Sequence, residues 1–359
     1  MKNICSLLAA ASLLAAMPMA LAGQPASAPA AAAPATPSGD LIVSAVGDIM
    51  LDASAGPIIK GMGYDYPFAK VRKFFDGSQV IFGNLEGPLT DRGTAVADKK
   101  FTFRSPPDKV SIALKNAGFT VVSLANNHML DYGPDGLAQT IEALDKVGIK
   151  HAGAGADLAA ARRPAILEAA GRKIAVLAYS ITYPESYYAG PGKPGTAFAY
   201  EEQVRADVTA ARKQADIVLV SFHWGQEGKT ELRDYQKSIG HMAIDCGADA
   251  VIGSHPHILQ GIERYKNGVI LYSMGNFTFG SYSSHSTRSA VATLRFHNGR
   301  LVQVRMYPIN VNNFEVAFQP KPLQGKEADA VIEGLAKLSA ERHTVMRDEN
   351  GVGVVDIQQ

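Results

Sequence analysis

Short apolar runs alternate with segments of helical spacing along most of the chain. The runs predict strands over residues 41–46, 80–82, 120–124, 174–179, 217–221, 250–252 and 269–272. Helices are predicted over residues 67–75, 108–118, 134–147, 201–215, 233–246 and 328–338. The alternation of strands and helices favours an α/β fold with much parallel pairing. A late hairpin about Asn298-Gly299, joining residues 291–296 to 301–308, predicts that the sheets are mixed.

Residues 1–22 have the pattern of a secretory signal peptide, with Lys2 before the apolar run 7–16 and small residues at 20–22. The run is short for a transmembrane helix, so we expect an exported protein without a transmembrane anchor, periplasmic or extracellular. Residues 23–39 are rich in Ala and Pro and uncharged, which predicts a flexible leader. The folded domain is expected over 40–320, with 321–359 forming a C-terminal helix and tail packed on it or trailing from it.

Charge and cysteine content narrow the class of protein. Removing Lys2 from the 35 basic residues leaves 34, which equals the 34 acidic residues. A neutral chain has no basic excess for nucleic acid, so no nucleic acid binding is expected. Cys5 lies in the predicted signal peptide and leaves only Cys246, so no intramolecular disulfide is expected.

Polar side chains directly follow six of the predicted strands. They are Asp48, Asn84, Glu86, Asn127, His128, His223, His255, His257 and Asn276. Ligands of open α/β sheets bind beyond the carboxyl ends of the strands, so these residues are expected to meet in one cleft. Their donor atoms are oxygen and imidazole nitrogen without thiolate. That chemistry favours one or two Mn, Fe or Zn ions in a hydrolytic site over a structural zinc site.

His255 and His257 flank Pro256 at the end of a predicted strand. Proline restricts the backbone on both sides, so the two imidazoles can be held toward one small volume. The alternative is that each candidate has a structural role. Asp48 is compatible with a turn, Glu86 with a surface carboxylate, and the histidines with loops or packing.

Six motifs span residues 46–279: VGDIML, FGNLEGPLT, LANNHMLDYG, SFHWGQE, GSHPHILQG and LYSMGNFTF. With them the chain resembles the CapA family of poly-γ-glutamate capsule synthesis proteins, whose fold is similar to calcineurin-like metallophosphoesterases. The resemblance implies a four-layer αββα sandwich, with two mixed sheets flanked by helices and a cleft at one edge. It also implies a link to capsule or cell-surface polymer metabolism, with the envelope machinery as a partner.

The resemblance also implies roles for the polar residues. The implied metal ligands are Asp48, Asn84, Glu86, Asn127, His223, His255 and His257. His128 resembles the histidine that protonates the leaving oxygen, with Asn127 beside it in the catalytic set. Asn126 is expected to stabilise the turn, and Asn276 to hydrogen-bond the loop of His255.

The chain departs from the metallophosphoesterase pattern at two positions. Met50 stands where a histidine is usual, and Asn84 stands where an aspartate is usual. Asn84 or Glu86 then takes the place of the bridging carboxylate. One of two metal positions is therefore expected to be weak, differently liganded or absent.

Three functions remain open from the sequence. The first is a metal-dependent hydrolase that attacks a phosphoester with metal-activated water. The second is a non-hydrolytic factor in the synthesis or export of an anionic polymer such as poly-γ-glutamate, and the third is an amide hydrolase at the same metal centre. The long loop 182–200, which holds four tyrosines, either covers the cleft or is an irregular surface loop.

Overall fold

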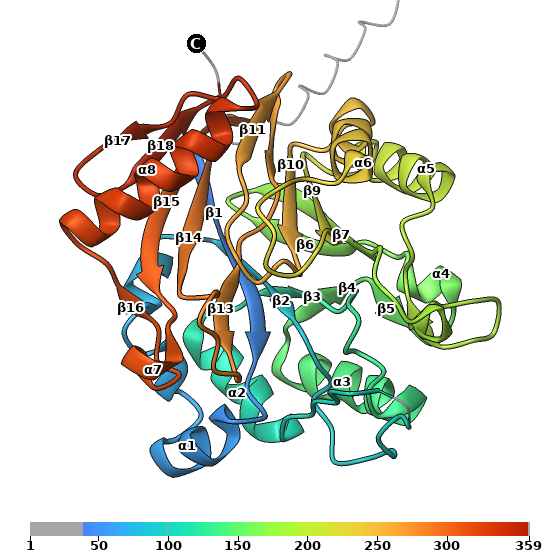
Figure 1. Ribbon diagram of the computed structural model, residues 1–359. Coiled ribbons are helices and arrows are strands. Elements are labelled where there is room, and N and C mark those ends of the chain that lie inside the picture. Colours follow the sequence, from blue (N-terminus) through green and yellow to red (C-terminus); the bar gives the residue numbers. More distant parts are fainter. Residues whose placement is uncertain (1–38, 98, 358–359) are drawn as a thin grey trace, which may run out of the picture. The chain divides into compact units, whose positions relative to one another are not determined.

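Residues 39–97 and 99–357 are described by a computed structural model (Figure 1). The predicted signal peptide, 1–22, and the predicted leader, 23–39, lie outside these residues except for Gly39. Within the part of the chain that the structure describes, no helix has the length and hydropathy that crossing a bilayer requires.

The larger sheet has ten strands among the described residues. Eight of them follow the order β17 (Arg347–Asp348), β18 (Gly353–Asp356), β15 (Arg300–Asn310), β14 (Arg288–His297), β1 (Asp40–Met50), β2 (Val80–Leu85), β3 (Val121–Ser123) and β4 (Lys150–Ala152). The other two are β13 (Asn276–Phe279), which pairs with β1, and β16 (Lys321–Pro322), which pairs with β15. Parallel pairs surround β2, and antiparallel pairs surround β15, so the sheet is mixed.

The smaller sheet is also mixed and has six strands in the described part of the chain. Its order is β11 (Ile262–Tyr265), β12 (Gly268–Leu271), β10 (Ala250–Ser254), β9 (Ile217–His223), β7 (Arg172–Ser180) and β6 (Ala165–Ala169). A separate pair is formed by β5 (Ala154–Gly155) and β8 (Gly195–Thr196). The four strands from β12 to β7 run parallel, as the strand and helix alternation predicts.

Helices connect the strands. The α-helices are α1 (Ala55–Met62), α2 (Pro107–Ala117), α3 (Gly133–Val147), α4 (Leu158–Ala161), α5 (Glu201–Arg212), α6 (Asp234–Asp245), α7 (Asn313–Val316) and α8 (Lys326–Ala340). Short 3₁₀ turns are η1 (Tyr66–Phe68), η2 (Arg72–Phe75) and η3 (Glu185–Tyr187).

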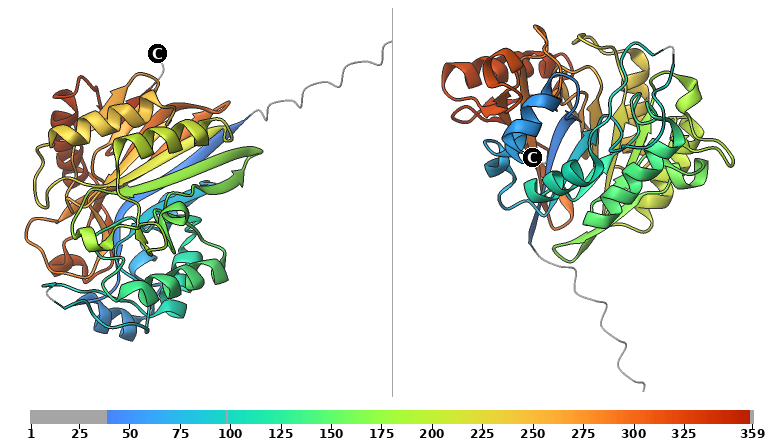
Figure 2. Two further views of the ribbon diagram at one scale, coloured as in Figure 1. Left: turned by 90° about the vertical axis from the view of Figure 1, so that its right-hand side faces the viewer. Right: turned by 90° about the horizontal axis from the view of Figure 1, so that it is seen from below.

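The two sheets pack face to face with helices on their outer faces, which gives four layers (Figure 2). Side chains alternate along each strand between the inner and the outer face of its sheet. In β1, Leu41 and Val43 enter the core between the two sheets, whereas Val46 and Ile49 pack in the core that contains α2 and α3. Strand β9 alternates in the same way between the inner core and the core that contains α5 and α6. The predicted αββα sandwich with two mixed sheets is therefore confirmed.

One predicted helix is wrong. Residues 67–75 form two 3₁₀ turns rather than a continuous α-helix. Backbone bonds span three residues here, as from the Phe68 amide to Asp65 and from the Phe74 amide to Val71. Phe68, Val71 and Phe75 are buried, so tertiary packing holds a segment whose apolar spacing resembles that of a helix.

The C-terminal segment adds strands to the larger sheet. Strand β18 pairs with β15, and β17 pairs with β18. Helix α8 contacts β15 of the larger sheet and β11 of the smaller one. Its Ser339 hydroxyl accepts a hydrogen bond from the Ile262 amide at 3.0 Å, which ties the helix to β11.

Two glycines allow backbones to approach closely where strands end. A Cβ on Gly47 would lie 1.7 Å from the Gly275 carbonyl oxygen, and one on Gly253 would lie 2.0 Å from the Tyr272 carbonyl oxygen. The first approach brings the ends of β1 and β13 together, and the second brings β10 against the segment after β12.

Replacing Gly253 by alanine is expected to lower the free energy of unfolding by about 2–3 kcal/mol, because the backbone must move apart to admit the methyl group. Denaturant unfolding measures this change. Gly334→Ala is the control, because no atom lies near a Cβ at that helical position. It is expected to raise stability by about 0.5–1 kcal/mol. Equal effects from the two substitutions would contradict the prediction.

Candidate metal centre

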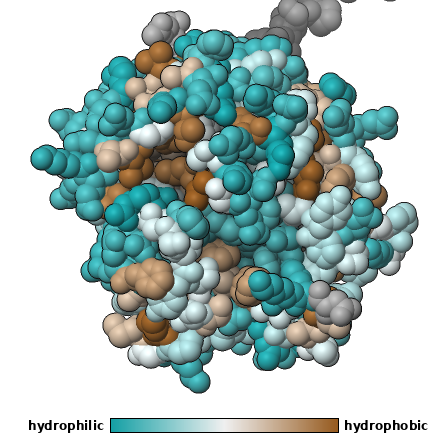
Figure 3. Space-filling model, in the orientation of Figure 1, coloured by the Kyte–Doolittle hydropathy of each residue, from teal (hydrophilic) through white to brown (hydrophobic). Residues whose placement is uncertain are grey.

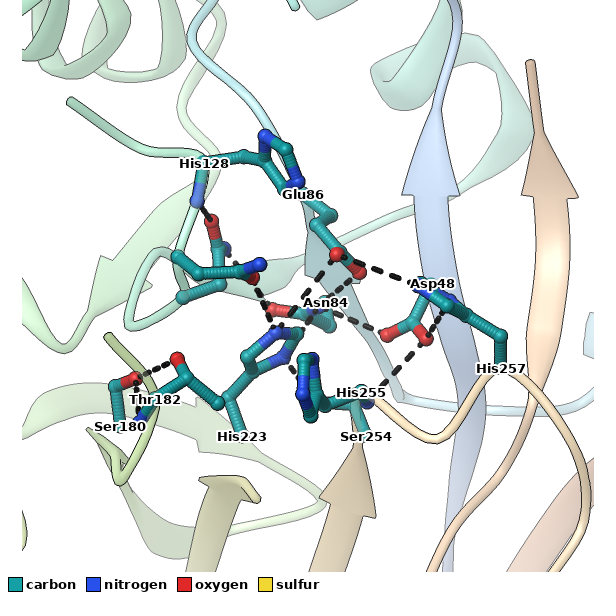
Figure 4. A network of polar contacts seen from close by, with 12 residues as sticks. Asp48, Asn84, Glu86, His128, Ser180, Thr182, His223, Ser254, His255 and His257 are labelled. Atoms are coloured by element: carbon teal, nitrogen blue, oxygen red, sulfur yellow. Dashed lines mark hydrogen bonds and ion pairs between the residues drawn. The ribbon is translucent and has the colours of Figure 1, made fainter. Parts of the chain in front are cut away.

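The ends of three parallel strands of the larger sheet place polar residues side by side. Asn84 of β2 and Asn276 of β13 are both register partners of Asp48 in β1. Strand β1 changes its partner here, because residues 40–45 pair with β14 and residues 48–50 pair with β13. Asp48 is therefore flanked on both sides by an asparagine, as Figure 4 shows for Asn84.

The smaller sheet presents a second polar row. His223 of β9 lies between Ser180 of β7 and Ser254 of β10 in the strand register. The turn that follows β10 carries His255 and His257, whose φ angles are +96° and +60°. Non-glycine residues rarely adopt positive φ, and such strain persists where the surrounding structure enforces it.

The turn after β3 supplies three further residues. The Asn126 amide donates to Asn84 Oδ1 at 3.2 Å and to the Leu85 carbonyl at 2.8 Å. Its own Oδ1 accepts a hydrogen bond from the His128 backbone amide at 3.2 Å. Asn126 thus fastens the turn to β2. Asn127 Oδ1 reaches His223 Nε2 at 2.8 Å.

Asn84 links the two carboxylates of the site. Its Nδ2 donates to Asp48 Oδ1 at 2.9 Å and to Glu86 Oε2 at 3.4 Å (Figure 4). The amide nitrogen therefore faces the carboxylates, while Oδ1 faces Asn126. All three side chains at 48, 84 and 86 are fully buried.

The histidines are oriented by neighbouring polar groups. His223 Nδ1 lies 3.0 Å from Ser254 Oγ, which leaves Nε2 directed toward Asn127 and Glu86. His257 Nδ1 lies 3.1 Å from Asp48 Oδ2 and 2.9 Å from Asn276 Oδ1. Asn276 thus contacts the side chain of His257, in the loop that also carries His255.

Two groups of possible ligand atoms overlap at Glu86. One consists of Glu86, His223 and His255, and the other of Asp48, Glu86 and His257. Glu86 Oε1 lies 3.7 Å from His223 Nε2 and 3.8 Å from His257 Nε2, beyond hydrogen-bond distance. Both distances suit atoms that share an ion.

Two buried polar atoms in this cluster have no hydrogen-bond partner among the described residues. They are Glu86 Oε1 and His255 Nδ1. A buried acceptor without a partner is costly, and a bound cation would satisfy both atoms. The residues present therefore fit a divalent ion held by carboxylate oxygen and imidazole nitrogen.

Burial and mutual charge set the protonation of the site. Burial, followed by the charge on His257, lowers the pKa of His255 to about 3, and burial also lowers the pKa of His223 well below its usual value. Burial opposes charge on His257 as well, but Glu86 and Asp48 outweigh it and raise its pKa to about 9. Burial and then Asp48 raise the pKa of Glu86. At neutral pH His223 and His255 are thus in the neutral form that binds metals.

His128 lies outside both groups of ligand atoms. Its Nδ1 is 2.7 Å from Oδ2 of Asp131, so Nε2 is the ring nitrogen left available. Burial lowers the pKa of His128, and Asp131 opposes that shift. Phe103 packs against His128 with ring centroids 4.5 Å apart, and Phe279 packs against His257 at 4.6 Å.

The sequence interpretation gave no role to Asp131, Lys99 or Tyr187, although Asp131 lies within a quoted motif. Asp131 is fully buried and contacts all three of His128, Lys99 and Tyr187. Its position three residues after His128, about one turn of chain, was the available signal. Lys99 and Tyr187 carry no comparable signal, because distant segments bring them here.

A separate groove of about 790 Å³ lies beside α8. Its walls include Leu259, Val331 and Leu338, and Figure 3 shows apolar side chains in a hollow on this part of the face. None of the predicted site residues lines the groove. The polar cluster is therefore the better candidate for chemistry.

Two solved structures show low similarity to this chain. The NAD nucleotidase of Haemophilus influenzae is 13% identical, with a TM-score of 0.48 over 84% of this chain and 63% of that one. The calcineurin-like phosphoesterase YfkN of Bacillus subtilis is 16% identical, with a TM-score of 0.44 over 74% of this chain and 88% of that one.

Sequence comparison gives closer relationships. The capsule biosynthesis protein CapA of Bacillus anthracis is 30% identical over 290 residues, which cover 79% of this chain and 69% of the relative. The PGA biosynthesis protein CapA of Bacillus subtilis (strain 168) is 32% identical over 274 residues, 76% of this chain and 72% of the relative. The family model described as bacterial capsule synthesis protein PGA_cap matches residues 42–281. The chain therefore belongs to the bacterial capsule synthesis protein PGA_cap family.

Proposed function

We propose that this protein is an exported metal-dependent hydrolase that cleaves a phosphoester in the metabolism of capsule or another cell-surface polymer. The observation that carries the proposal is that two buried atoms, Glu86 Oε1 and His255 Nδ1, have no hydrogen-bond partner among the described residues. Both residues belong to the overlapping groups of possible ligands. A cluster evolved only for packing would be expected to satisfy these atoms internally. Family membership supports the link to capsule synthesis.

In this proposal Glu86 is the shared ligand. His223 and His255 complete one position, and Asp48 and His257 complete the other. Asn127 contributes its amide oxygen beside His223, and Asn84 holds the carboxylates in place by hydrogen bonds. A divalent Mn, Fe or Zn ion in such a site lowers the pKa of water and polarises a phosphoryl oxygen.

His128 is proposed as the general acid. Asp131 accepts a hydrogen bond from Nδ1, which fixes the ring and leaves Nε2 to hold the proton that passes to the leaving oxygen. The carboxylate of Asp131 also stabilises the imidazolium that this role needs, against the cost of burial. Phe103 packs on the ring and limits its rotation.

The second candidate is a non-hydrolytic factor that helps to make or export an anionic polymer and works with the envelope machinery. The names of the relatives favour it, because they refer to capsule or PGA biosynthesis and not to hydrolysis. In this case a bound ion would hold the strand ends in place and would take no part in a reaction. Export is proposed for both candidates from the signal-peptide pattern of residues 1–22.

A chelation experiment separates the candidates. The purified protein is stripped of metal, reloaded singly with Mn, Fe or Zn, and assayed on nitrophenyl and alkyl phosphate esters. We expect turnover that disappears on chelation and returns on reloading. Binding of poly-γ-glutamate is measured in parallel on the stripped and reloaded forms.

Turnover that is absent with every metal, together with polymer binding that survives complete chelation, would replace the hydrolase by the non-hydrolytic factor. Release of free amino groups from poly-γ-glutamate by the reloaded protein, without phosphoester cleavage, would establish an amide hydrolase instead. Turnover and polymer binding are measured on the same preparations. A preparation that has lost its fold would therefore fail in both assays and would give neither of these results.

A further inference from the structure

The side chain of Asp131 joins three segments that are far apart in the sequence. Its Oδ2 accepts hydrogen bonds from His128 Nδ1 at 2.7 Å and from the Phe103 amide at 2.8 Å. Its Oδ1 accepts one from the Tyr187 hydroxyl at 3.0 Å and contacts the Lys99 ammonium in a salt bridge. We call Asp131, His128, Lys99 and Tyr187 the Asp131 cluster.

Lys99 brings the described residues of segment 91–105, which are 91–97 and 99–105, to this cluster. Its ammonium contacts the Asn127 carbonyl and lies 3.2 Å from His128 Nδ1. It also lies over the Tyr187 ring, 5.0 Å from the centroid. Lys99 therefore provides the positive charge beside a fully buried carboxylate, and its removal leaves that carboxylate uncompensated.

Tyr187 brings the loop 182–200 to the same carboxylate. Its side chain is buried, whereas Tyr183 and Tyr200 of the same loop are exposed. The β5–β8 pair holds the loop backbone, and Thr196 of β8 donates from its hydroxyl to the Tyr187 carbonyl at 3.2 Å. The loop thus sends one tyrosine inward, to the residue that orients His128.

We propose that Tyr187 and Lys99 are positioning residues that act on His128 through Asp131, so that segment 91–105 and loop 182–200 must both be seated for His128 to be aligned. This inference rests on the proposed role of His128 as general acid. The two oxygens of Asp131 together accept from four donors, about as many as a carboxylate can accommodate. Loss of a donor on Oδ1 leaves that oxygen poorly satisfied and allows the carboxylate to turn away from His128.

Matched tyrosine variants test the proposal. Tyr187→Phe deletes only the hydroxyl that reaches Asp131. Tyr188→Phe, the control, deletes a neighbouring hydroxyl that donates to the Thr182 carbonyl within the same loop. Lys99→Met and its neighbour Lys100→Met form a second pair, since Lys100 contacts the exposed Phe101 ring instead of the cluster.

Two measurements on the metal-free protein are independent of activity. Hydrogen exchange is expected to rise in both 91–105 and 182–200 for Tyr187→Phe, but only in 182–200 for Tyr188→Phe. Nitrogen NMR is expected to show the His128 proton on Nδ1 in the wild type, because Asp131 accepts from that nitrogen. In Tyr187→Phe and Lys99→Met the proton is expected to be shared between the two ring nitrogens.

Kinetics provide the third measurement. Turnover of an alkyl phosphate is expected to fall about tenfold in Tyr187→Phe, because an alkoxide leaving group needs a proton from an aligned acid. Turnover of a nitrophenyl phosphate is expected to change little, since its leaving group departs without protonation. A purely structural role would lower both rates together.

The proposal is overturned if exchange in 91–105 and the His128 tautomer are unchanged in both Tyr187→Phe and Lys99→Met. It is also overturned if the ratio of alkyl to nitrophenyl turnover stays at the wild-type value in both variants. A wild-type protein that is inactive with every metal defeats the proposed hydrolysis. In that case exchange and NMR still decide whether the Asp131 cluster aligns His128.

Discussion

Replacing Glu86 by glutamine is expected to remove the metal from the purified protein. Glu86 is the one residue common to both groups of ligand atoms, and it is fully buried. Glutamine keeps the shape and removes the charge that a cation needs, so both positions lose a ligand at once. Elemental analysis should find about one or two Mn, Fe or Zn ions per wild-type chain and close to none in Glu86→Gln.

Two further variants of this chain complete the experiment. Glu168→Gln makes the same chemical change at an exposed carboxylate of β6 outside both ligand groups, and it should retain the metal. The double variant His255→Ala/His257→Ala removes one imidazole from each group and should lose it. Full metal content in Glu86→Gln, or none in the wild type after supplementation, would contradict the metal centre.

The same metal measurement has a defined pH dependence. The pKa of His257 in the metal-free site is raised to about 9, so this ring carries a proton at neutral pH. Metal must displace the proton, so the apparent affinity is expected to fall at least about tenfold for each pH unit below that pKa. The fall becomes steeper where Glu86, whose pKa is also raised, is protonated as well. His255, with its pKa lowered to about 3, remains neutral over this range and adds no such loss.

Replacing His128 by alanine is expected to lower turnover by about 10²–10⁴-fold and leave the metal content unchanged. His128 belongs to neither ligand group, and Asp131 holds its Nδ1. The loss should be larger for alkyl esters than for nitrophenyl esters.

A histidine outside the site provides the control. His151 of β4 is half-buried and lies 3.4 Å from Asp145, away from the candidate ligands. His151→Ala should change neither turnover nor metal content. If His128→Ala loses its metal, His128 is a ligand and the general acid must be sought elsewhere.

The sequence by itself determined the order and type of most elements and the residues at the strand ends. Strands such as β1 and β9 were predictable because their apolar runs are local patterns. Asp48, His223 and His255 could be assigned to strand ends for the same reason. The motifs over 46–279 also identified the family, which the comparisons confirm.

Only the tertiary structure decided how these ends meet. The change of partner at Asp48 depends on strand register, which local patterns do not encode. The 3₁₀ turns over 67–75 have the apolar spacing of a helix, so packing alone distinguished the two.

The same limit applies to the Asp131 cluster. Lys99 and Tyr187 lie in irregular segments without periodicity, and they reach Asp131 only because two sheets and a loop are assembled. Packing then gives the carboxylate of Asp131 four donors and leaves Glu86 Oε1 without a hydrogen-bond donor in the part of the chain that the structure describes. The sequence supplies the chemical groups. The packing of distant segments decides which of them have hydrogen-bond partners and which are left available to a bound ligand.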